Sequence, residues 1–139
     1  MKISNASAHW EGDLQKGKGG MKLGKAGYEG KFTFGSRFEN ADGTNPEELL
    51  GAALAGCYSM FLSAILSKDG HVPTRIDTTA KVHLGDGPKV ELFDLVTEAV
   101  VPGIDQKTFD KYAEEAKKNC PVSVALGAVD KKLTAKLVK

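Results

Sequence analysis

Hydrophobic and polar positions alternate most clearly between residues 75 and 84. The even positions carry the more apolar side chains, Ile76, Thr78, Ala80, Val82 and Leu84, and the odd positions carry mostly polar ones. A period of two predicts a half-buried β-strand over this segment. The residues at 85–88, Gly-Asp-Gly-Pro, predict a turn, and the apolar segment 90–101 predicts the partner strand.

A long apolar segment after residue 45 predicts the central helix, which we expect to reach about Ser67. Asn45 is a favourable N-cap, Pro46 suits the first helical position, and Glu48 stands three residues after the cap, as in a capping box. Residues 49–66 carry no charge and are apolar on nearly every side, so we expect a core helix surrounded by other elements rather than a membrane span. Its small residues predict a face for close packing of a second helix: Gly51, Ala52, Ala55, Gly56 and Ser59.

The segment before this helix reads as a small β-meander over residues 2–34. We expect a strand over 3–11, a glycine-rich turn at 17–20 and a second strand over 28–34. The polar segment 36–44 contains Asp-Gly and is predicted to be a loop.

The segment after the two central strands predicts two more helices and a last strand. Asp105 is a favourable N-cap for a helix over about 106–118, and Pro121 can begin a short helix to Leu126. Apolar residues then alternate up to Leu137 in a final strand. The predicted order, βββ-α-ββ-α-α-β, indicates an α+β fold with mostly antiparallel strands in a single domain over residues 1–139.

Composition narrows the classes of function. The chain has 139 residues, and 19 Lys and Arg against 18 Asp and Glu give a net charge of +1, so no strongly basic surface for nucleic acid is expected. Two cysteines are too few for a disulfide scaffold or a four-cysteine zinc site. The first residues show no signal-peptide pattern, so we expect a cytoplasmic protein, in which cysteines more often serve chemistry than cross-linking.

Two further motifs point to ordinary structure rather than to ligands. In residues 19–26 two glycines precede a lysine, as in a phosphate-binding loop, but Ala26 stands where a magnesium-binding Ser or Thr is required. The three histidines, His9, His71 and His83, lack the spacing of metal ligands. We therefore expect a glycine-rich hairpin without a nucleotide, and no metal site.

Cys57 and Cys120 are the candidate reactive groups, although either could be a small buried hydrophobic residue. Cys57 follows Glu47 by ten residues on the predicted helix, which is about 15 Å along its axis. A link between them therefore needs a third side chain, and the long guanidinium of Arg37 is available in the preceding loop. Cys120 directly precedes a helix begun by proline, whose backbone N–H groups favour a thiolate or another anion.

Four segments carry a wider similarity. They are Ser-Arg-Phe-Glu at 36–39, Thr-Asn-Pro-Glu-Glu-Leu-Leu-Gly-Ala-Ala leading to Ala-Gly-Cys over 44–57, Val-Pro-Gly-Ile-Asp at 101–105, and Asn-Cys-Pro-Val-Ser at 119–123. Together they resemble the OsmC/Ohr family of osmotically induced and organic-hydroperoxide-resistance thiol peroxidases. An arginine just before the long helix resembles the OsmC branch more than the Ohr branch, where it lies nearer the N-terminus. The likeness covers nearly the whole chain and implies an OsmC-like α+β fold, with mostly antiparallel sheets around two long helices of an intertwined homodimer.

The resemblance also implies roles for four residues. Cys57 would be the peroxidatic nucleophile, Cys120 the resolving thiol, and Arg37 with Glu47 the activating pair. A thiol in apolar surroundings ionises poorly without a nearby cation, and arginine is always protonated, so these roles are physically consistent.

The implied activity is the reduction of organic hydroperoxides, and more weakly of hydrogen peroxide, in oxidative or osmotic stress defence. It proceeds through a sulfenic acid and an intramolecular Cys57–Cys120 disulfide, which an external dithiol reduces. The resemblance implies no cofactor or metal, and neither a nucleic acid nor a membrane as partner. Two alternatives use the same sequence features, a non-catalytic two-cysteine redox sensor and a dimer that binds an apolar ligand.

Overall fold

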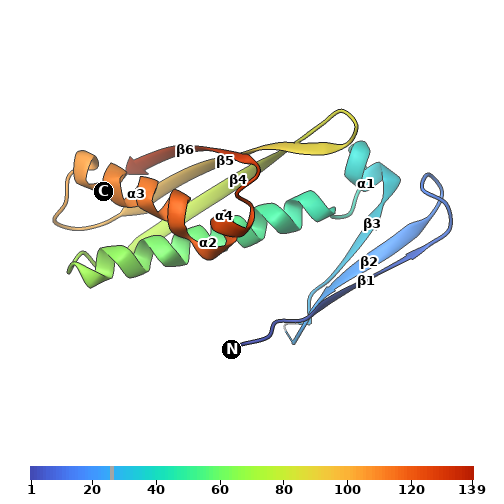
Figure 1. The fold of residues 1–139 in the computed structure, drawn as a ribbon, viewed down its shortest axis with the longest axis horizontal. Helices are drawn as coiled ribbons and strands as arrows, with labels where there is room; N and C mark the ends of the chain where they lie inside the picture. Colours follow the sequence, from blue (N-terminus) through green and yellow to red (C-terminus); the bar gives the residue numbers. More distant parts are fainter. Residues whose placement is uncertain (26) are drawn as a thin grey trace. The chain divides into compact units, whose positions relative to one another are not determined.

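The computed structural model describes residues 1–25 and 27–139, and Figure 1 traces the elements in chain order. Ala26, the position compared above with a phosphate-binding loop, lies outside the described residues. The order of elements is β1-β2-β3-α1-α2-β4-β5-α3-α4-β6, which confirms the α+β class and adds one helix to the expected order. The chain divides into two compact units, Met1–Leu49 and Leu50–Lys139.

The first unit contains the expected β-meander. Strands β1 (Ala6–Glu11), β2 (Lys18–Leu23) and β3 (Glu29–Thr33) form an antiparallel sheet in the order β1-β2-β3. The first strand begins three residues later than expected. Most of the segment predicted as a glycine turn lies in the middle strand, β2.

The prediction of a turn at residues 17–20 was wrong. Glycine occurs here because neighbouring side chains leave no room for a Cβ atom, not because the chain turns. Gly19 lies inside β2, opposite Trp10 in β1 and Phe32 in β3. A Cβ atom at Gly19 would come within 2.8 Å of a Trp10 ring carbon and 2.9 Å of a Phe32 ring carbon. The two rings lie 5.2 Å apart across the strand, so only a residue without a side chain fits between them.

A short helix, α1 (Phe34–Phe38), occupies part of the segment predicted to be a loop. Thr33 and Ser36 form its capping box, in which each side chain accepts a hydrogen bond from the other residue's backbone N–H. The Ser36 hydroxyl also donates to the backbone oxygen of Thr44 at 2.8 Å. Polar residues in this segment therefore satisfy a helix end and a neighbouring chain segment rather than only facing solvent.

The central helix, α2 (Pro46–Lys68), begins as predicted. The Asn45 side-chain oxygen accepts the backbone N–H of Glu48 at 2.8 Å, which confirms the N-cap. The Glu48 carboxylate accepts a hydrogen bond from the Thr44 hydroxyl at 2.8 Å. The helix runs through the boundary between the units, so its first turn belongs to the first unit and the remainder to the second.

The second unit is built on a sheet in the order β4-β5-β6, formed by β4 (Arg75–Gly85), β5 (Lys89–Val100) and β6 (Asp130–Leu137). The pair β4–β5 is antiparallel and the pair β5–β6 is parallel. The crossover between the parallel strands contains α3 (Gln106–Asn119) and α4 (Pro121–Ala125). This crossover brings the residues after α3 back to the sheet face that α2 covers.

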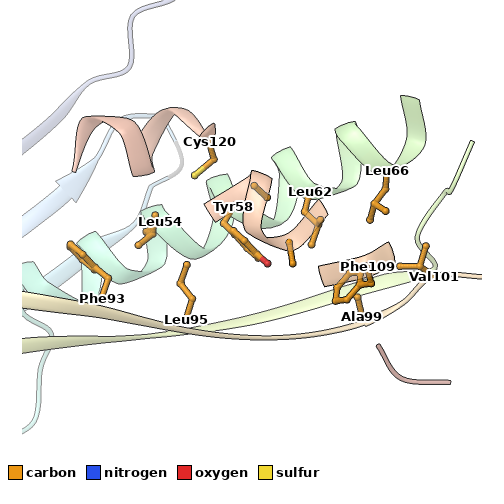
Figure 2. Close-up of a cluster of buried hydrophobic side chains, with 12 residues drawn as sticks. Leu54, Tyr58, Leu62, Leu66, Phe93, Leu95, Ala99, Val101, Phe109 and Cys120 are labelled. Carbon is orange, nitrogen blue, oxygen red and sulfur yellow. The ribbon is translucent and has the colours of Figure 1, made fainter. Parts of the chain in front are cut away.

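The core of the second unit lies between that sheet and its helices (Figure 2). Helix α2 contributes every fourth residue, Leu54, Tyr58, Leu62 and Leu66. Strand β5 contributes Phe93, Leu95 and Ala99, and α3 contributes Phe109, Ala113 and Ala116. Since alternate β5 residues point to the same face, α2 and α3 pack on one side of the sheet.

Within the single chain, the elements around α2 leave one side of the helix uncovered. Four residues along one row of the helix are exposed, Ala52, Gly56, Met60 and Ala64, and Met60 is 79% exposed. Gly51 instead faces the sheet, where a Cβ atom would lie 3.1 Å from Val82. Among the described residues, α2 is also the helix whose length and composition suit a membrane span, and 28% of its apolar window is buried.

Candidate active site

Arg37 and Glu47 form an ion pair within the first unit. The Arg37 Nη2 atom donates to Glu47 Oε1 at 2.7 Å, and Nε lies 3.2 and 3.3 Å from the two carboxylate oxygens. The side chain of Glu47 is 10% exposed and that of Arg37 is 32% exposed. Two donors and both acceptors are engaged, so the plane of the guanidinium is fixed relative to the carboxylate.

Local structure explains why these two side chains meet. Arg37 lies on α1, and Glu47 lies in the first turn of α2. The Asn45 side chain donates to the backbone oxygen of Ser36 at 3.1 Å while capping α2, so it ties the two helices together. The Arg37 guanidinium also lies 5.2 Å from the centre of the Phe38 ring, a cation–π distance.

Cys57 lies on α2 in the second unit, half-buried and free. Its sulfur accepts the backbone N–H of Val122 at 3.4 Å. Val122 follows Pro121, the first residue of α4, and the first N–H groups of a helix have no partner within that helix. The sequence therefore supplies a free backbone donor directly beside the candidate nucleophile.

Cys120 is free and fully buried in the core cluster that also contains Leu54 and Tyr58 (Figure 2). Burial raises the pKa of the Cys120 thiol, the Ser123 backbone opposes this rise, and the nearby Cys57 thiol adds to it. The backbone at the helix start therefore favours a Cys120 thiolate, as expected, but burial raises the pKa by more. The α4 helix is only five residues long, and desolvation of the sulfur outweighs what its N-terminus contributes.

The structure brings the four predicted residues together as two pairs. Arg37 contacts Glu47 in the first unit, and Cys57 lies beside Cys120 and the start of α4 in the second. The described ranges contain no group of three or more His, Cys, Asp or Glu side chains that could hold a metal ion. A pair of free thiols with different burial can form a sulfenic acid at one sulfur and a disulfide between the two.

A cavity of about 230 Å³ lies in the first unit, and its walls are mostly apolar. It is lined by Trp10, Leu14, Phe32, Thr33, Phe34, Arg37 and Phe38. The rings form two tilted pairs, Trp10 with Phe32 and Phe34 with Phe38, with centroids 5.2 and 5.0 Å apart. Neither Trp10 nor the Val122 N–H was expected from the sequence to lie at these positions. For Val122, the sequence indicates only that Pro121 begins a helix, whose first N–H groups are free.

Comparisons with known proteins agree with this architecture. The sequence profile of the OsmC family, described as OsmC-like protein, matches residues 39–134. Peroxiredoxin OsmC of Escherichia coli (strain K12) is 48% identical over 126 residues, which cover 87% of each chain. The organic hydroperoxide resistance protein of Xanthomonas axonopodis pv. citri (strain 306) is 33% identical over 97 residues, which cover 67% of each chain.

A solved structure supports the fold. The crystal structure of an organic hydroperoxide resistance protein from Elizabethkingia anophelis matches with a TM-score of 0.78 and 24% identity, covering 99% of both chains. The fold is thus that of the α+β proteins related to OsmC and the organic hydroperoxide resistance proteins. The chain belongs to the OsmC-like protein family. The resemblance given by its sequence motifs is confirmed.

Proposed function

We propose that this protein is a thiol peroxidase that reduces organic hydroperoxides with Cys57 as its nucleophile. The observation that carries the proposal is the half-buried Cys57 sulfur beside the buried Cys120 at the start of α4. The names of the relatives, a peroxiredoxin and a hydroperoxide resistance protein, support the same reaction class. Both cysteines are free, which suits work in the reducing cytoplasm.

The proposed reaction has three steps. The Cys57 thiol first releases its proton to solvent, the thiolate attacks the distal peroxide oxygen, and the O–O bond breaks, so that Cys57 becomes a sulfenic acid and the alkoxide takes a proton from solvent and leaves as the alcohol. Cys120 then attacks the Cys57 sulfur, forming the disulfide and releasing water. An external dithiol reduces this disulfide and becomes oxidised itself. The Val122 N–H stabilises the negative charge of the Cys57 thiolate in the first step.

Arg37 is proposed to activate this chemistry, with Glu47 as its positioning residue. A guanidinium held by two of its nitrogens is a fixed cation that can pair with a thiolate and donate to a peroxide oxygen. We propose that it acts on Cys57 in the assembled homodimer, whichever subunit provides it. No cofactor or metal takes part in these steps.

The preference for organic peroxides is proposed from the cavity beside Arg37. Its volume of about 230 Å³ and its aromatic walls suit an alkyl or aryl group, whereas hydrogen peroxide has no apolar surface to bury. Each buried methylene contributes roughly 0.8 kcal/mol, so two or three of them favour the organic substrate by about ten- to fifty-fold after incomplete burial.

A homodimer is proposed because apolar surface remains uncovered in the single chain. The exposed row on α2, formed by Ala52, Gly56, Met60 and Ala64, has small residues that allow close helix contact. The first unit exposes further apolar side chains, including Ile3 and Phe38. An intertwined pair of chains would cover both surfaces and complete the single OsmC-like domain expected from residues 1–139.

The cysteine roles are tested in a single turnover of fully reduced protein. Cys57→Ser should abolish peroxide consumption, because a serine hydroxyl does not ionise near neutral pH. Cys120→Ser should consume about one equivalent and leave a sulfenic acid that a dimedone-type reagent traps. Identical behaviour of the two variants would show that the assigned roles are wrong.

Continuous turnover separates an enzyme from a redox sensor. With excess dithiol and alkyl hydroperoxide, the proposed enzyme should consume many equivalents at a constant rate. One rapid oxidation followed by very slow recycling would instead favour the sensor.

The substrate preference is tested with cumene hydroperoxide against hydrogen peroxide. We expect kcat/KM to favour cumene hydroperoxide by about ten- to fifty-fold, and Phe38→Ala to reduce that ratio by about threefold or more because one aromatic wall is lost. Tyr28→Ala is the matched control, since Tyr28 is an exposed aromatic residue of the same unit that does not line the cavity. Equal efficiencies for both peroxides would exclude the cavity as a substrate site.

A further inference from the structure

Lys131 is a lysine on the partly buried face of β6, and its side chain hydrogen-bonds backbone oxygens outside the strand. It lies on β6, and its side chain turns to the partly buried side of the sheet rather than to solvent. Its ammonium donates to the backbone oxygens of Leu126 at 2.7 Å and Val129 at 3.1 Å. The same nitrogen lies 6.0 Å from the centre of the Phe93 ring.

These contacts hold one end of α4, the helix whose other end carries the thiol site. Leu126 is the C-cap of α4, and helix-terminal carbonyls lack partners within the helix. At the opposite end Cys120 is the N-cap, and Val122 donates its N–H to the Cys57 sulfur. Lys131 is therefore connected to both cysteines through the short backbone segment of α4.

A helix of five residues depends on such external contacts. Isolated helices shorter than about 12 residues are marginal in water, so α4 has little stability of its own. A cation at a helix C-terminus pairs with the free carbonyls and with the negative end of the helix dipole. Within α4 itself, Ser123 is buried, and its hydroxyl donates to the backbone oxygen of Lys117. The other residues of the helix are partly buried or exposed.

We propose that Lys131 is a positioning residue for the resolving step, which holds α4 so that the Cys120 sulfur stays within reach of oxidised Cys57. The proposal rests on the function proposed above. In that step the Cys120 thiol loses its proton, its sulfur bonds to the Cys57 sulfur, the S–O bond of the sulfenic acid breaks, and water leaves. The step needs no external reductant.

The electrostatic surroundings of Lys131 fit this role. Burial lowers the pKa of Lys131, and the charges of Cys120 and Asp130 oppose that change. The Lys131 amine therefore lies close enough to Cys120 to interact with its charge, and Cys120 must become a thiolate to react. Peroxide attack at Cys57 should depend on Lys131 less, because α4 contributes one hydrogen bond to the Cys57 sulfur, from the Val122 N–H, whereas Cys120 is itself the N-cap of α4.

The test separates the two steps in a single turnover. Reduced protein is mixed with one equivalent of cumene hydroperoxide, and peroxide loss and disulfide formation are followed separately by acid quench and mass analysis of alkylated thiols. Lys131→Met should slow disulfide formation about tenfold, because the hydrogen bonds to the Leu126 and Val129 oxygens are lost, and should slow peroxide loss by at most about twofold. Lys131→Arg should recover most of the rate, since it keeps a cation with several donors.

Lys132→Met is the matched control, because the next lysine of β6 is exposed on the opposite face of the strand. It should form the disulfide at the unaltered rate. Amide hydrogen exchange of reduced Lys131→Met gives a measurement independent of peroxide chemistry, with faster exchange expected at Val124 and Leu126 than in the unaltered chain.

Three outcomes would overturn the proposal. They are an unchanged disulfide rate in Lys131→Met, an equal slowing of both steps, and a failure of Lys131→Arg to recover. The unaltered chain shows whether the role of Lys131 or the proposed function has failed. If the unaltered chain consumes peroxide and forms the disulfide, and Lys131→Met forms it equally fast, only the role of Lys131 is wrong. If the unaltered chain forms no disulfide, both proposals are lost.

Discussion

The two units of the chain are stabilised by different kinds of contact. The second unit has an apolar core, with large side chains such as Tyr58, Phe93 and Phe109 fully buried. In the described part of the first unit, Met21 is the buried large hydrophobic residue, and the other buried positions are glycines, Ser36 and Glu47. Burial of apolar surface stabilises the second unit, whereas hydrogen-bonded strands and a polar cluster organise the first.

The two arginines of the sequence show the same contrast. Arg37 pairs with Glu47 in the first unit, with side chains 32% and 10% exposed. Arg75 pairs with Asp77 in the second unit, with side chains 71% and 55% exposed. Exposed ion pairs contribute little to stability, while a shielded pair with fixed geometry keeps a cation in one place. The less tightly packed unit therefore holds the better positioned charge.

The largest expected difference between the units is in the cost of removing an aromatic side chain. Phe93→Ala should lower the free energy of unfolding by about 3–5 kcal/mol, because it leaves a cavity in a closed core. Phe32→Ala should cost about 1–2 kcal/mol, because Phe32 is half-buried and loses mainly its contact with Trp10. Urea unfolding of both variants measures these values, and equal losses would contradict the difference in packing between the two units.

Local signals in the sequence predicted the regular elements well. Asn45 and Pro46 predicted the start of α2, and Asp105 predicted the start of α3, because a cap is made by residues adjacent in sequence. The prediction that Gly19 belongs to a turn was wrong. A glycine is needed there because aromatic rings on the two neighbouring strands occupy the space of a side chain. The alternation of apolar residues predicted the strand β6, but it did not predict that β6 pairs parallel to β5.

The candidate site was predicted in its residues but not in its surroundings. The pairing of Arg37 with Glu47 was expected, and the structure shows it. The N–H of Val122 at the Cys57 sulfur was not predictable, because residues 65 positions apart meet only after the crossover has folded.

The next largest effect concerns the two arginines. Arg37→Ala should slow the reaction of Cys57 with cumene hydroperoxide at pH 7 by about a hundredfold, because the proposed cation is lost from the reacting centre. Part of the rate should return at high pH, where thiolate forms without a cation. Stopped-flow kinetics measures both effects, and Arg75→Ala, the matched control, should react at the unaltered rate.

A smaller effect is expected from the partner of Arg37. Glu47→Gln keeps an acceptor for one guanidinium nitrogen but removes the charge, so we expect a loss of about tenfold or less in the same reaction. A loss in Glu47→Gln larger than that in Arg37→Ala would contradict the assignment of Glu47 as a positioning residue.

The smallest predicted effect tests a polar atom inside the tightly packed unit. The Tyr58 hydroxyl is buried, and it has no hydrogen-bond partner among the described residues. Burial raises the pKa of Tyr58 from 10.0 to about 12, and the nearby Thr97 hydroxyl opposes this rise. Tyr58→Phe removes an unsatisfied hydroxyl and keeps the ring, so at pH 7 it should leave stability unchanged or raise it by about 1 kcal/mol.

The sign of the pH dependence follows from the raised pKa. Because folded Tyr58 holds its proton more tightly than the unfolded chain does, its contribution is fully present below pH 10 and is lost as the pH rises toward about 12. Tyr58→Phe should therefore lose less stability than the unaltered chain over this range, as measured by urea unfolding at several pH values. Tyr112→Phe is the control, because its hydroxyl donates to Asp69 at 2.6 Å, and it should show a small loss at pH 7 instead. A clear destabilisation by Tyr58→Phe at pH 7 would mean that the hydroxyl is hydrogen-bonded in solution, and that a polar contact contributes to the core of the second unit.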